Sequence, residues 1–297
     1  MCVNWQERFA ETPDVLIGAR SCRTVVTVGK VSIGGGKFVT MAGPCSVESE
    51  EQLSSIGYFV RRAGASFLRG GAFKPRSSPY AFQGLGRKGL ELLVEVRRRT
   101  GLAIVTEVMA ERDVPMVAEA ADMLQIGSRS MENDSLLEAA ARSGRPILLK
   151  RGLMASIGDL LRAAQIILSC GNPNVVLCER GIRTFDNTLR NTFDAAGIAL
   201  LKQITHLPVI ADPSHACGNR ELVPELARIG VAAGADGMIV EVHPDPARAW
   251  SDGEQSLTFA GFEKMMHDLA PWIALREQAL CQQQTLTVLT PCAEAAA

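Results

Sequence analysis

The 297-residue sequence lacks both a long apolar run and an excess of charge of either sign. It has no stretch of about 18 apolar residues that could cross a bilayer. Lys and Arg number 31 against 32 Asp and Glu, so a net charge of -1 gives no cationic field to attract nucleic acid. Residues 1–20 also lack the basic and apolar regions of a secretory signal. We therefore expect a cytoplasmic globular protein that binds neither nucleic acid nor membrane.

Cysteine pairs with redox or metal-binding spacing are also absent. The 8 cysteines lie between Cys2 and Cys292, and none forms a CxxC pair. They are too dispersed for a disulfide scaffold in a chain of this length. We expect mostly reduced thiols, and we interpret Cys170 and Cys178 as small buried hydrophobic residues.

Short β-rich apolar runs recur along the chain and alternate with segments of helical spacing, such as 50–65 and 157–171. The runs lie at 38–43, 66–70, 103–108, 122–127, 146–152, 174–181, 207–215 and 236–243. Eight strands buried on both faces, each followed by a helix, predict a closed (β/α)8 TIM barrel of the α/β class. An open doubly wound sheet is the alternative, although no GxGxxG turn follows the first strand.

The ends of the chain differ from this repeating pattern. Residues 24–38 predict a short N-terminal β-hairpin that caps the floor of the barrel. We expect residues 1–275, hairpin included, to form one catalytic domain. Residues 276–297 have no clear period and end in small residues, which predicts a loosely packed or disordered tail.

Charged residues follow nearly every predicted strand, where barrels of this type carry their catalytic groups. Loop solvation accounts for any one of them. Runs such as ILLKRG, however, place charge directly after buried apolar residues, where an unpaired charge is costly. The basic residues among them predict a strongly anionic ligand that carries phosphate and carboxylate groups. They are Arg69, Lys74, Arg76, Arg129, Lys150, Arg151, Arg180 and Arg183.

A second set, Cys45, His215, Glu241 and Asp252, contains metal-ligand side chains. Their spacing matches no compact zinc motif, so only their shared position after the strands favours a metal site. One thiolate, one imidazole and two carboxylates suit Mn, Fe, Co or Zn better than Mg or Ca. The alternative is that Cys45 is a buried hydrophobic residue. Of the other histidines, His243 stays ambiguous, and we interpret His206 and His267 as structural or surface residues.

Several long motifs between about residues 24 and 272 resemble the 3-deoxy-D-arabino-heptulosonate 7-phosphate (DAHP) synthases of type I, beta subgroup. The motifs are GPCSVES, LRGGAFKPRSSPYAFQGLG, LQIGSRSMEN, LLKRG, NPNVVLCERGIRTF, LPVIADPSHACG and ADGMIVEVHPDPARAWSDGEQSL. The resemblance implies a transferase that forms a carbon–carbon bond between phosphoenolpyruvate and erythrose 4-phosphate and releases phosphate. This reaction is the first step of the shikimate pathway. The resemblance further implies a divalent metal, no nucleotide cofactor, and a homo-oligomer, either a dimer or a tetramer.

The resemblance also implies a role for each matching residue. Glu107 would orient the attacking water, and Asp212 would lie near the aldehyde; together with Lys74 and Lys150 they form the expected catalytic set. Arg76 and Ser77 would hold the sugar phosphate. The expected ligands of the metal are Cys45, His215, Glu241 and Asp252. The residues expected to hold phosphoenolpyruvate are Arg69, Lys74, Arg129, Lys150 and Arg180, the last three around its phosphate.

Alternatives remain at this point. A sister synthase, 3-deoxy-8-phosphooctulonate (KDO8P) synthase, joins phosphoenolpyruvate to arabinose 5-phosphate. It carries an Asn-containing loop in place of KPRSS and often lacks the metal cysteine. Ser130, Glu132 and Cys217 depart from the expected pattern, which leaves room for a modified aldehyde in a specialised pathway. More distant alternatives are a Schiff-base aldolase using Lys150 and an inactive barrel with a regulatory role.

Overall fold

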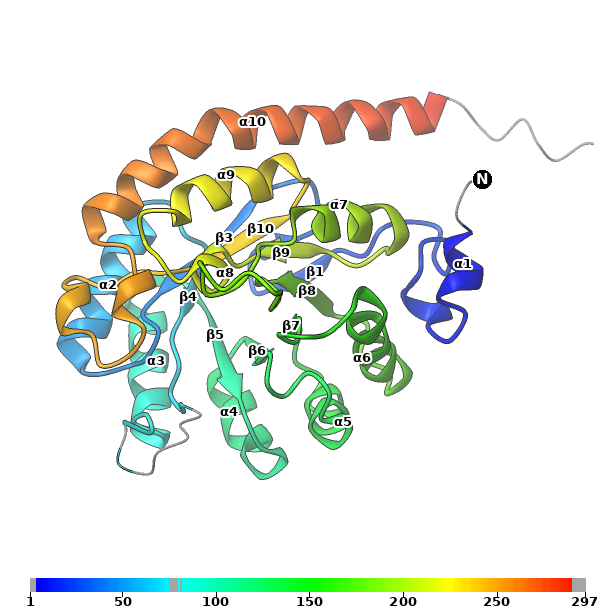
Figure 1. Cartoon of the computed structure of the whole chain (residues 1–297). Helices are drawn as coiled ribbons and strands as arrows, with labels where there is room; N and C mark the ends of the chain where they lie inside the picture. The colour runs from blue at the N-terminus through cyan, green and yellow to red at the C-terminus, as the bar shows by residue number, and fades with distance from the viewer. Residues whose placement is uncertain (1–3, 75–79, 81, 290–297) are drawn as a thin grey trace, which may run out of the picture.

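The computed structural model describes residues 4–74, 80 and 82–289. Within them, eight parallel strands close into a barrel surrounded by helices (Figure 1). Each strand lies inside its predicted run, and the (β/α)8 prediction is confirmed. In order around the barrel the strands are β3 (Val39–Gly43), β4 (Phe67–Arg69), β5 (Ala103–Val108), β6 (Met123–Ile126), β7 (Ile147–Lys150), β8 (Val175–Glu179), β9 (Val209–Ala211) and β10 (Gly237–Glu241), which pairs with β3.

Helices connect the strands on the outside of the barrel. They begin at side-chain caps in several cases: Ser49 accepts from the backbone N–H of Gln52, and Ser156 and Asp159 form a capping box. The helices are α1 (Trp5–Arg8), α2 (Glu50–Arg62), α3 (Arg87–Thr100), α4 (Val114–Ala120), α5 (Asp134–Arg142), α6 (Ile157–Ser169), α7 (Ala195–Ile204), α8 (Pro213–Cys217), α9 (Val223–Ala232) and α10 (Phe259–Leu289). Short 3-10 turns are η1 (Pro13–Val15), η2 (Glu111–Asp113), η3 (Pro246–Arg248) and η4 (Gly253–Gln255).

The strands are continuous apolar runs because both of their faces are buried. On β7, Leu148 packs in the cluster that fills the barrel, whereas Ile147 and Leu149 pack in the larger cluster between barrel and helices. Successive side chains point to opposite faces of a strand. The same alternation determines which charged side chains at the carboxyl end of each strand point into the barrel mouth and which point toward the helices.

The N-terminal hairpin consists of β1 (Val26–Val28) and β2 (Val31–Ile33), paired antiparallel. Val26, Val28 and Ile33 are buried in the same cluster as Met41 and Phe67 from the barrel interior. The hairpin therefore closes the barrel at the end where the strands begin. The predicted hairpin at 24–38 is confirmed.

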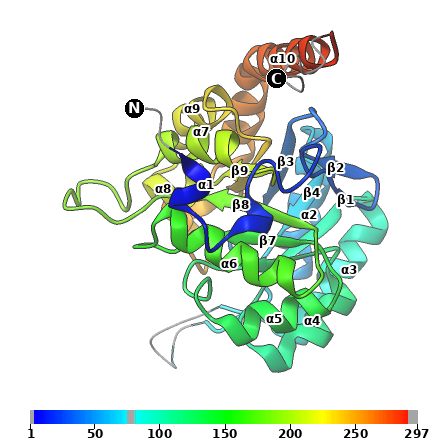
Figure 2. The ribbon, with the colours of Figure 1, turned by 90° about the vertical axis from the view of Figure 1, so that its right-hand side faces the viewer.

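The C-terminal segment differs from the expected loose tail, because α10 continues without a break through residue 275 to Leu289. It runs along the outside of the barrel past α9 (Figures 1 and 2). Arg276 donates to Asp236 Oδ1 at 2.6 Å and to the Gly36 carbonyl at 2.7 Å, and Glu277 accepts from the Phe38 N–H at 2.9 Å. These contacts fix the start of the supposed tail to the hairpin region. Residues 290–297 lie outside the described residues.

The run at 207–215 also differs from its prediction as one extended segment. Strand β9 ends at Ala211, and residues 213–217 form α8. Asp212 caps this helix by accepting from the His215 backbone N–H at 3.0 Å, and Pro213 supplies a helical φ in the first turn. His215 therefore projects from a helix rather than from a strand end.

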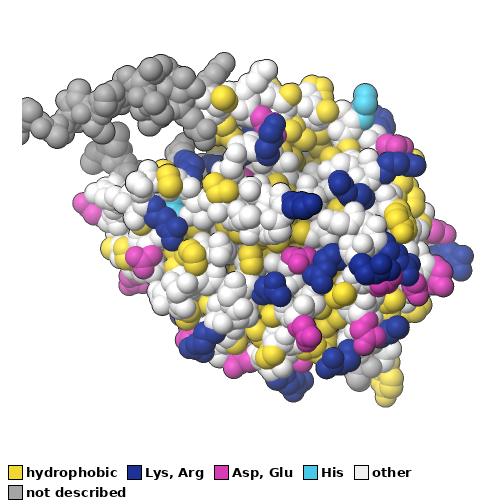
Figure 3. Space-filling model, turned by 180° about the vertical axis from the view of Figure 1, so that it is seen from behind, with side chains coloured by type: hydrophobic (Ala, Val, Ile, Leu, Met, Phe, Trp, Pro, Cys, Tyr) yellow, Lys and Arg dark blue, Asp and Glu magenta, His cyan; other side chains and the backbone are white. Residues whose placement is uncertain are grey.

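The surface mixes charges of both signs. On the face seen from behind, Lys and Arg side chains are interspersed with Asp and Glu (Figure 3). No helix in the described part of the chain is long and apolar enough to cross a membrane.

Candidate active site

A strongly basic cavity lies at the carboxyl ends of the barrel strands. Its acidic lining groups are Glu107 and Asp252, far fewer than its cations. Among the cations, Arg180 is 4% exposed, and its Nε has no hydrogen-bond partner among the described residues. Burial lowers the pKa of Arg180, although nearby Asp212 opposes this effect. The arrangement suits a polyanionic ligand. The basic residues that line the cavity are Arg69, Lys74, Arg129, Lys150, Arg180, Arg183 and Arg190.

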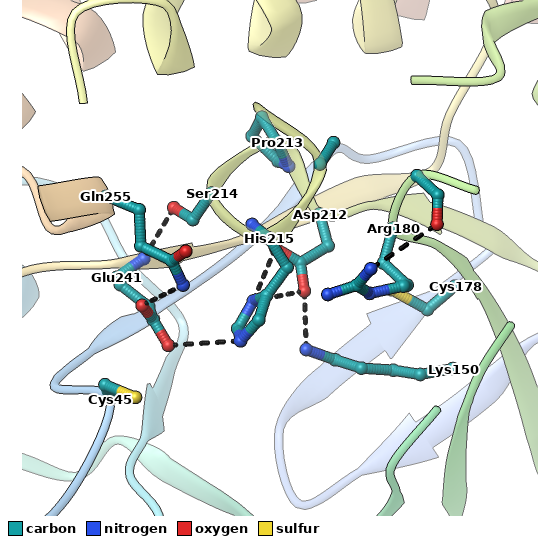
Figure 4. Close-up of polar contacts among 12 residues, drawn as sticks. Cys45, Lys150, Cys178, Arg180, Asp212, Pro213, Ser214, His215, Glu241 and Gln255 are labelled. Carbon is teal, nitrogen blue, oxygen red and sulfur yellow. Dashed lines mark hydrogen bonds and ion pairs between the residues drawn. The ribbon is translucent and has the colours of Figure 1, made fainter. Parts of the chain in front are cut away.

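Asp212 connects the cavity lysine to the histidine of α8 (Figure 4). Its Oδ2 lies 2.5 Å from Lys150 Nζ and 2.9 Å from His215 Nδ1. Burial opposes ionisation of Asp212, yet His215 and Lys150 hold its pKa well below the usual range. A carboxylate on Nδ1 orients the imidazole and directs Nε2 toward the opposite side.

The Nε2 atom of His215 faces a second carboxylate, 3.4 Å from Glu241 Oε1. Burial lowers the pKa of His215, although Asp212 and Glu241 act in the opposite direction. A neutral imidazole that donates from Nδ1 to Asp212 has a lone pair on Nε2, so two electron-pair donors face one another. Arg69 and Gln255 hold Glu241 from the other sides, at 2.8 Å from Oε1 and 2.6 Å from Oε2.

Cys45 completes this group from the loop after β3. Its Sγ lies 2.9 Å from Asp252 Oδ2 and 2.8 Å from Lys74 Nζ. Burial raises the pKa of the thiol to about 12, and the Glu241 carboxylate adds to this effect. Asp252 keeps a pKa of about 2 despite its burial, because the Cys45 hydrogen bond and His215 favour its ionised form.

These donor groups fit a divalent cation. Ligand atoms of Cys45, Glu241 and Asp252 all lie within 4.8 Å of one another, and His215 Nε2 reaches Glu241 as described above. The site contains a buried thiol with a raised pKa, two carboxylates, and an imidazole lone pair that faces one of them. A positive charge at the centre of these groups would stabilise them. One sulfur, one nitrogen and two oxygen ligands match borderline transition-metal ions.

Glu107 lines a different wall of the cavity, at the end of β5. Gln125 donates to its Oε2 at 3.2 Å. A Cβ atom on Gly127 would lie only 2.0 Å from Glu107 Oε1, so glycine at this position leaves room for the carboxylate. Glu107 is therefore held by the hydrogen bond from Gln125, in space that Gly127 leaves open.

Arg151, which the sequence placed with the ligand-binding cations, points elsewhere. Arg151 does not line the cavity; its Nη1 lies 2.9 Å from Glu179 Oε2 and 2.7 Å from Asp194 Oδ2. Lys150 faces inward on β7, so strand alternation turns the next residue toward the helices. The expected convergence of Arg151 on the anion is therefore wrong. Glu179 instead accepts from the Gly181 N–H at 2.6 Å, behind Arg180.

Other predicted residues fall in three groups. Asp212 and Glu241 contact cavity residues without lining the cavity themselves. His243, left ambiguous by its sequence context, pairs with Glu48 at 3.3 Å. Arg76 and Ser77, the expected grip on the sugar phosphate, lie outside the described residues.

Sequence reasoning missed Arg190, Asn191, Gln125 and Gln255. Arg190 lines the cavity and donates to Gln255 Oε1, whose amide also holds Glu241. The only sign of its role in the sequence is that it follows Arg180 and Arg183 in the irregular stretch after β8. Gln125 lies inside a strand, where a polar residue in a buried run is a usable sign of function.

Comparison with known proteins identifies relatives with the same fold. A curated phospho-2-dehydro-3-deoxyheptonate aldolase of Thermotoga maritima is 49% identical over 246 residues, 83% of this chain and 73% of its own length. A 2-dehydro-3-deoxyphosphooctonate aldolase of Acidithiobacillus ferrooxidans is 34% identical over 250 residues, 78% of this chain and 88% of its own length.

Solved structures agree with this comparison. The crystal structure of the Thermotoga maritima DAHP synthase superposes with a TM-score of 0.87 at 46% identity, covering 89% of this chain and 77% of that one. A truncated form of the Thermotoga maritima enzyme gives 0.84 at 42% identity, with 90% and 98% covered. The family model of the DAHP synthetase I family matches residues 12–274. On this evidence the chain belongs to the DAHP synthetase I family.

Proposed function

We propose that this chain condenses phosphoenolpyruvate with erythrose 4-phosphate, giving DAHP and inorganic phosphate, as the first step of the shikimate pathway. The observation that carries the proposal is that seven basic side chains line one cavity together with Cys45, His215 and Asp252, and that Glu241 lies directly behind these three. Both substrates are phosphorylated, and phosphoenolpyruvate adds a carboxylate, so the basic cavity matches their charge.

Phosphoenolpyruvate would be held by five of the cations. Arg129, Lys150 and Arg180 would contact its phosphate, while Arg69 and Lys74 bind nearer the proposed metal ligands, where Arg69 also holds Glu241. Buried Arg180 supplies an N–H without a partner among the described residues. Holding the anion in one orientation lowers the entropic cost of reaching the transition state.

The metal ligands would be Cys45, His215, Glu241 and Asp252. When bound, a divalent ion such as Mn, Fe, Co or Zn supplies Lewis-acid polarisation of the aldehyde. Asp212 would keep His215 in the tautomer with a free Nε2, and its contact with Lys150 links the ligand set to the phosphate site. Its placement near the aldehyde stays a prediction.

Bond formation joins C3 of phosphoenolpyruvate to the aldehyde carbon, and the aldehyde oxygen takes up a proton. A water molecule adds to C2, and Glu107, fixed by Gln125, would orient it and accept its proton. The bond from C2 to the phosphate oxygen then breaks, and the C2 hydroxyl gives its proton to the departing phosphate, so that C2 becomes the ketone of DAHP and inorganic phosphate leaves. The surrounding Arg and Lys side chains stabilise the shifting negative charge.

Phosphate release after metal reconstitution tests the proposal. We expect rapid release from phosphoenolpyruvate with erythrose 4-phosphate, and slow release with arabinose 5-phosphate or without an aldehyde. Preference for arabinose 5-phosphate would instead support the second candidate, a KDO8P synthase, which the 34% identity to octonate aldolases keeps open. Trapping of substrate on Lys150 by borohydride would indicate a Schiff-base aldolase.

We further propose that hairpin and barrel act as one catalytic domain, since they share one hydrophobic cluster. A cytoplasmic location and assembly into a dimer or tetramer also remain proposals. Analytical ultracentrifugation of the full chain measures the oligomeric state directly.

A further inference from the structure

Two neighbouring loops carry proposed metal ligands. Cys45 lies on the loop after β3 and Asp252 on the loop after β10, and these two strands are neighbours in the barrel. Each ligand has a serine beside it in the sequence. The two hydroxyls, on Ser46 and Ser251, lie 2.6 Å apart and are buried. A hydrogen bond thus joins the loops one residue away from each ligand.

A second link joins the same loops through Glu48. Its Oε1 accepts from the Trp250 backbone N–H at 2.8 Å, and its Oε2 lies 3.3 Å from His243 Nε2. The Nδ1 atom of His243 accepts from the Asp245 N–H at 3.1 Å, which places the imidazole proton on Nε2, where it donates to Glu48. The Glu48 and His243 side chains are 8% and 7% exposed, so this pair is desolvated.

None of these groups lines the substrate cavity. A buried carboxylate is costly unless its hydrogen bonds are satisfied, and here both partners come from the facing loop. Substrate contact therefore does not account for Glu48 or His243. What the contacts do is hold the loop of Cys45 against the loop of Asp252.

The backbone of Asp252 shows why such a link is needed. Its φ is 48°, the one positive φ of a non-glycine residue in the described part of the chain. A left-handed conformation of this kind persists only where the surroundings enforce it. The following residue is equally constrained, because a Cβ on Gly253 would lie 2.1 Å from the Pro246 carbonyl oxygen. In this conformation the Asp252 carboxylate reaches Cys45 Sγ at 2.9 Å.

We propose that Ser46, Ser251, Glu48 and His243 form a loop clamp that sets the separation of Cys45 and Asp252 for the metal ion. They are positioning residues, because they act through the ligands rather than by contact with substrate. The inference rests on the proposed metal site, so its test must separate failure of the clamp from failure of the site.

The test measures binding of Co²⁺ to the reduced, metal-free full chain by calorimetry and by the thiolate-to-cobalt absorption band. We expect Ser46→Ala, Ser251→Ala and Glu48→Gln each to weaken Co²⁺ binding by about 10- to 100-fold and to alter the band. The double variant of Ser46 and Ser251 should be little weaker than either single variant, because each single change already removes the shared hydrogen bond. If the two substitutions caused unrelated structural defects, their losses of binding free energy would add instead.

Ser54→Ala is the matched control for the serine variants. It removes a buried Oγ on α2 that has no hydrogen-bond partner in the described residues, and Co²⁺ affinity should stay within about 2-fold of the unmodified chain. Glu50→Gln, an exposed partner of Arg99, is the control for Glu48→Gln. Circular dichroism confirms that each variant is folded.

The outcomes are distinct. Affinities and spectra of the clamp variants equal to those of Ser54→Ala, in a chain that itself binds Co²⁺, would overturn the clamp alone. Additive losses in the double variant would also count against it. Absence of Co²⁺ binding by the unmodified reduced chain would overturn the proposed metal site and the clamp with it.

Discussion

The ammonium group of Lys74 lies 2.8 Å from the Sγ atom of Cys45, and it also donates to the Cys45 carbonyl oxygen at 3.0 Å. A proposed phosphoenolpyruvate-binding residue thus contacts a proposed metal ligand directly. Since Arg69 makes the corresponding contact with Glu241, the anion site and the ligand set share two hydrogen-bonded cations. Changes on one side are therefore expected to affect the other.

Cys45→Ser should sharply reduce both metal retention and turnover, because a hydroxyl is a poor substitute for a thiolate with borderline ions. Elemental analysis after gel filtration measures the bound metal, and phosphate release measures turnover. Cys22→Ser, at an exposed cysteine, is the matched control. Full activity of chelator-stripped enzyme, shown to be metal-free, would contradict the Lewis-acid role.

Asp212→Asn should weaken metal binding by about 10- to 100-fold, because Asp212 fixes the Nδ1 proton and the orientation of His215. The same change leaves Lys150 without its carboxylate, so the KM for phosphoenolpyruvate should also change. Steady-state kinetics and Co²⁺ titration measure the two effects. Asp186→Asn, in an exposed loop, should alter neither; a Co²⁺ affinity unchanged in Asp212→Asn would refute the proposed coupling.

Arg180→Ala should abolish most of the thermal stabilisation that phosphoenolpyruvate gives. A ligand at 100 times its Kd stabilises the folded state by about 2.7 kcal/mol, and this effect disappears as affinity falls. Melting temperatures with and without phosphoenolpyruvate measure the difference. Arg248→Ala changes an exposed arginine and should keep the full shift. Equal shifts in both variants would remove Arg180 from the anion site.

Arg151→Met should destabilise the fold by about 3–5 kcal/mol, because it leaves the buried Glu179 carboxylate without its cation. Glu179→Gln should cost less, because Arg151 keeps its ion pair with Asp194. Arg151→Met and Glu179→Gln together should cost less than the sum of the two single changes. Urea unfolding measures each free energy. The exposed pair of Arg142 and Glu138 is the control, with an expected interaction of about 0–1 kcal/mol. Additivity in the buried pair would show that its members do not interact.

His206 should make stability fall in mild acid. Burial lowers the pKa of His206, while its Nδ1 bonds Thr24 Oγ1 at 2.8 Å and its Nε2 bonds the Asp14 carbonyl at 2.7 Å. Below pH 6.5 the unfolded chain binds a proton that the folded chain resists, so unfolding becomes easier as pH falls from 6.5 toward the lowered pKa.

The expected slope from this one group is at most about 1.4 kcal/mol per pH unit. Urea unfolding at several pH values between 7.5 and 5 measures it. His206→Gln should lose this contribution, whereas His267→Gln, at an exposed position, should keep the slope of the unmodified chain. The same slope in His206→Gln would refute the assignment.

The architecture of the fold and the chemical type of the site follow from the amino-acid sequence. Eight apolar runs need burial on both faces, and only a sheet covered on both sides provides it. Their alternation with helical segments indicates that the sheet is parallel. Chain order then placed Lys150, Arg180 and Glu241 at the same end of the barrel. The motifs around Cys45 and His215 pointed to the family that the comparisons confirmed.

Which charged side chains contact one another depends on the three-dimensional path of the chain. Arg151 follows Lys150 directly, yet the pleat turns it toward Glu179 and Asp194. Glu48 and His243 pair across 195 positions, and sequence spacing carries no signal for such a contact. A closed barrel brings its first and last strands together, so the partners of a loop residue depend on barrel register and loop path, which local patterns of hydrophobicity do not encode.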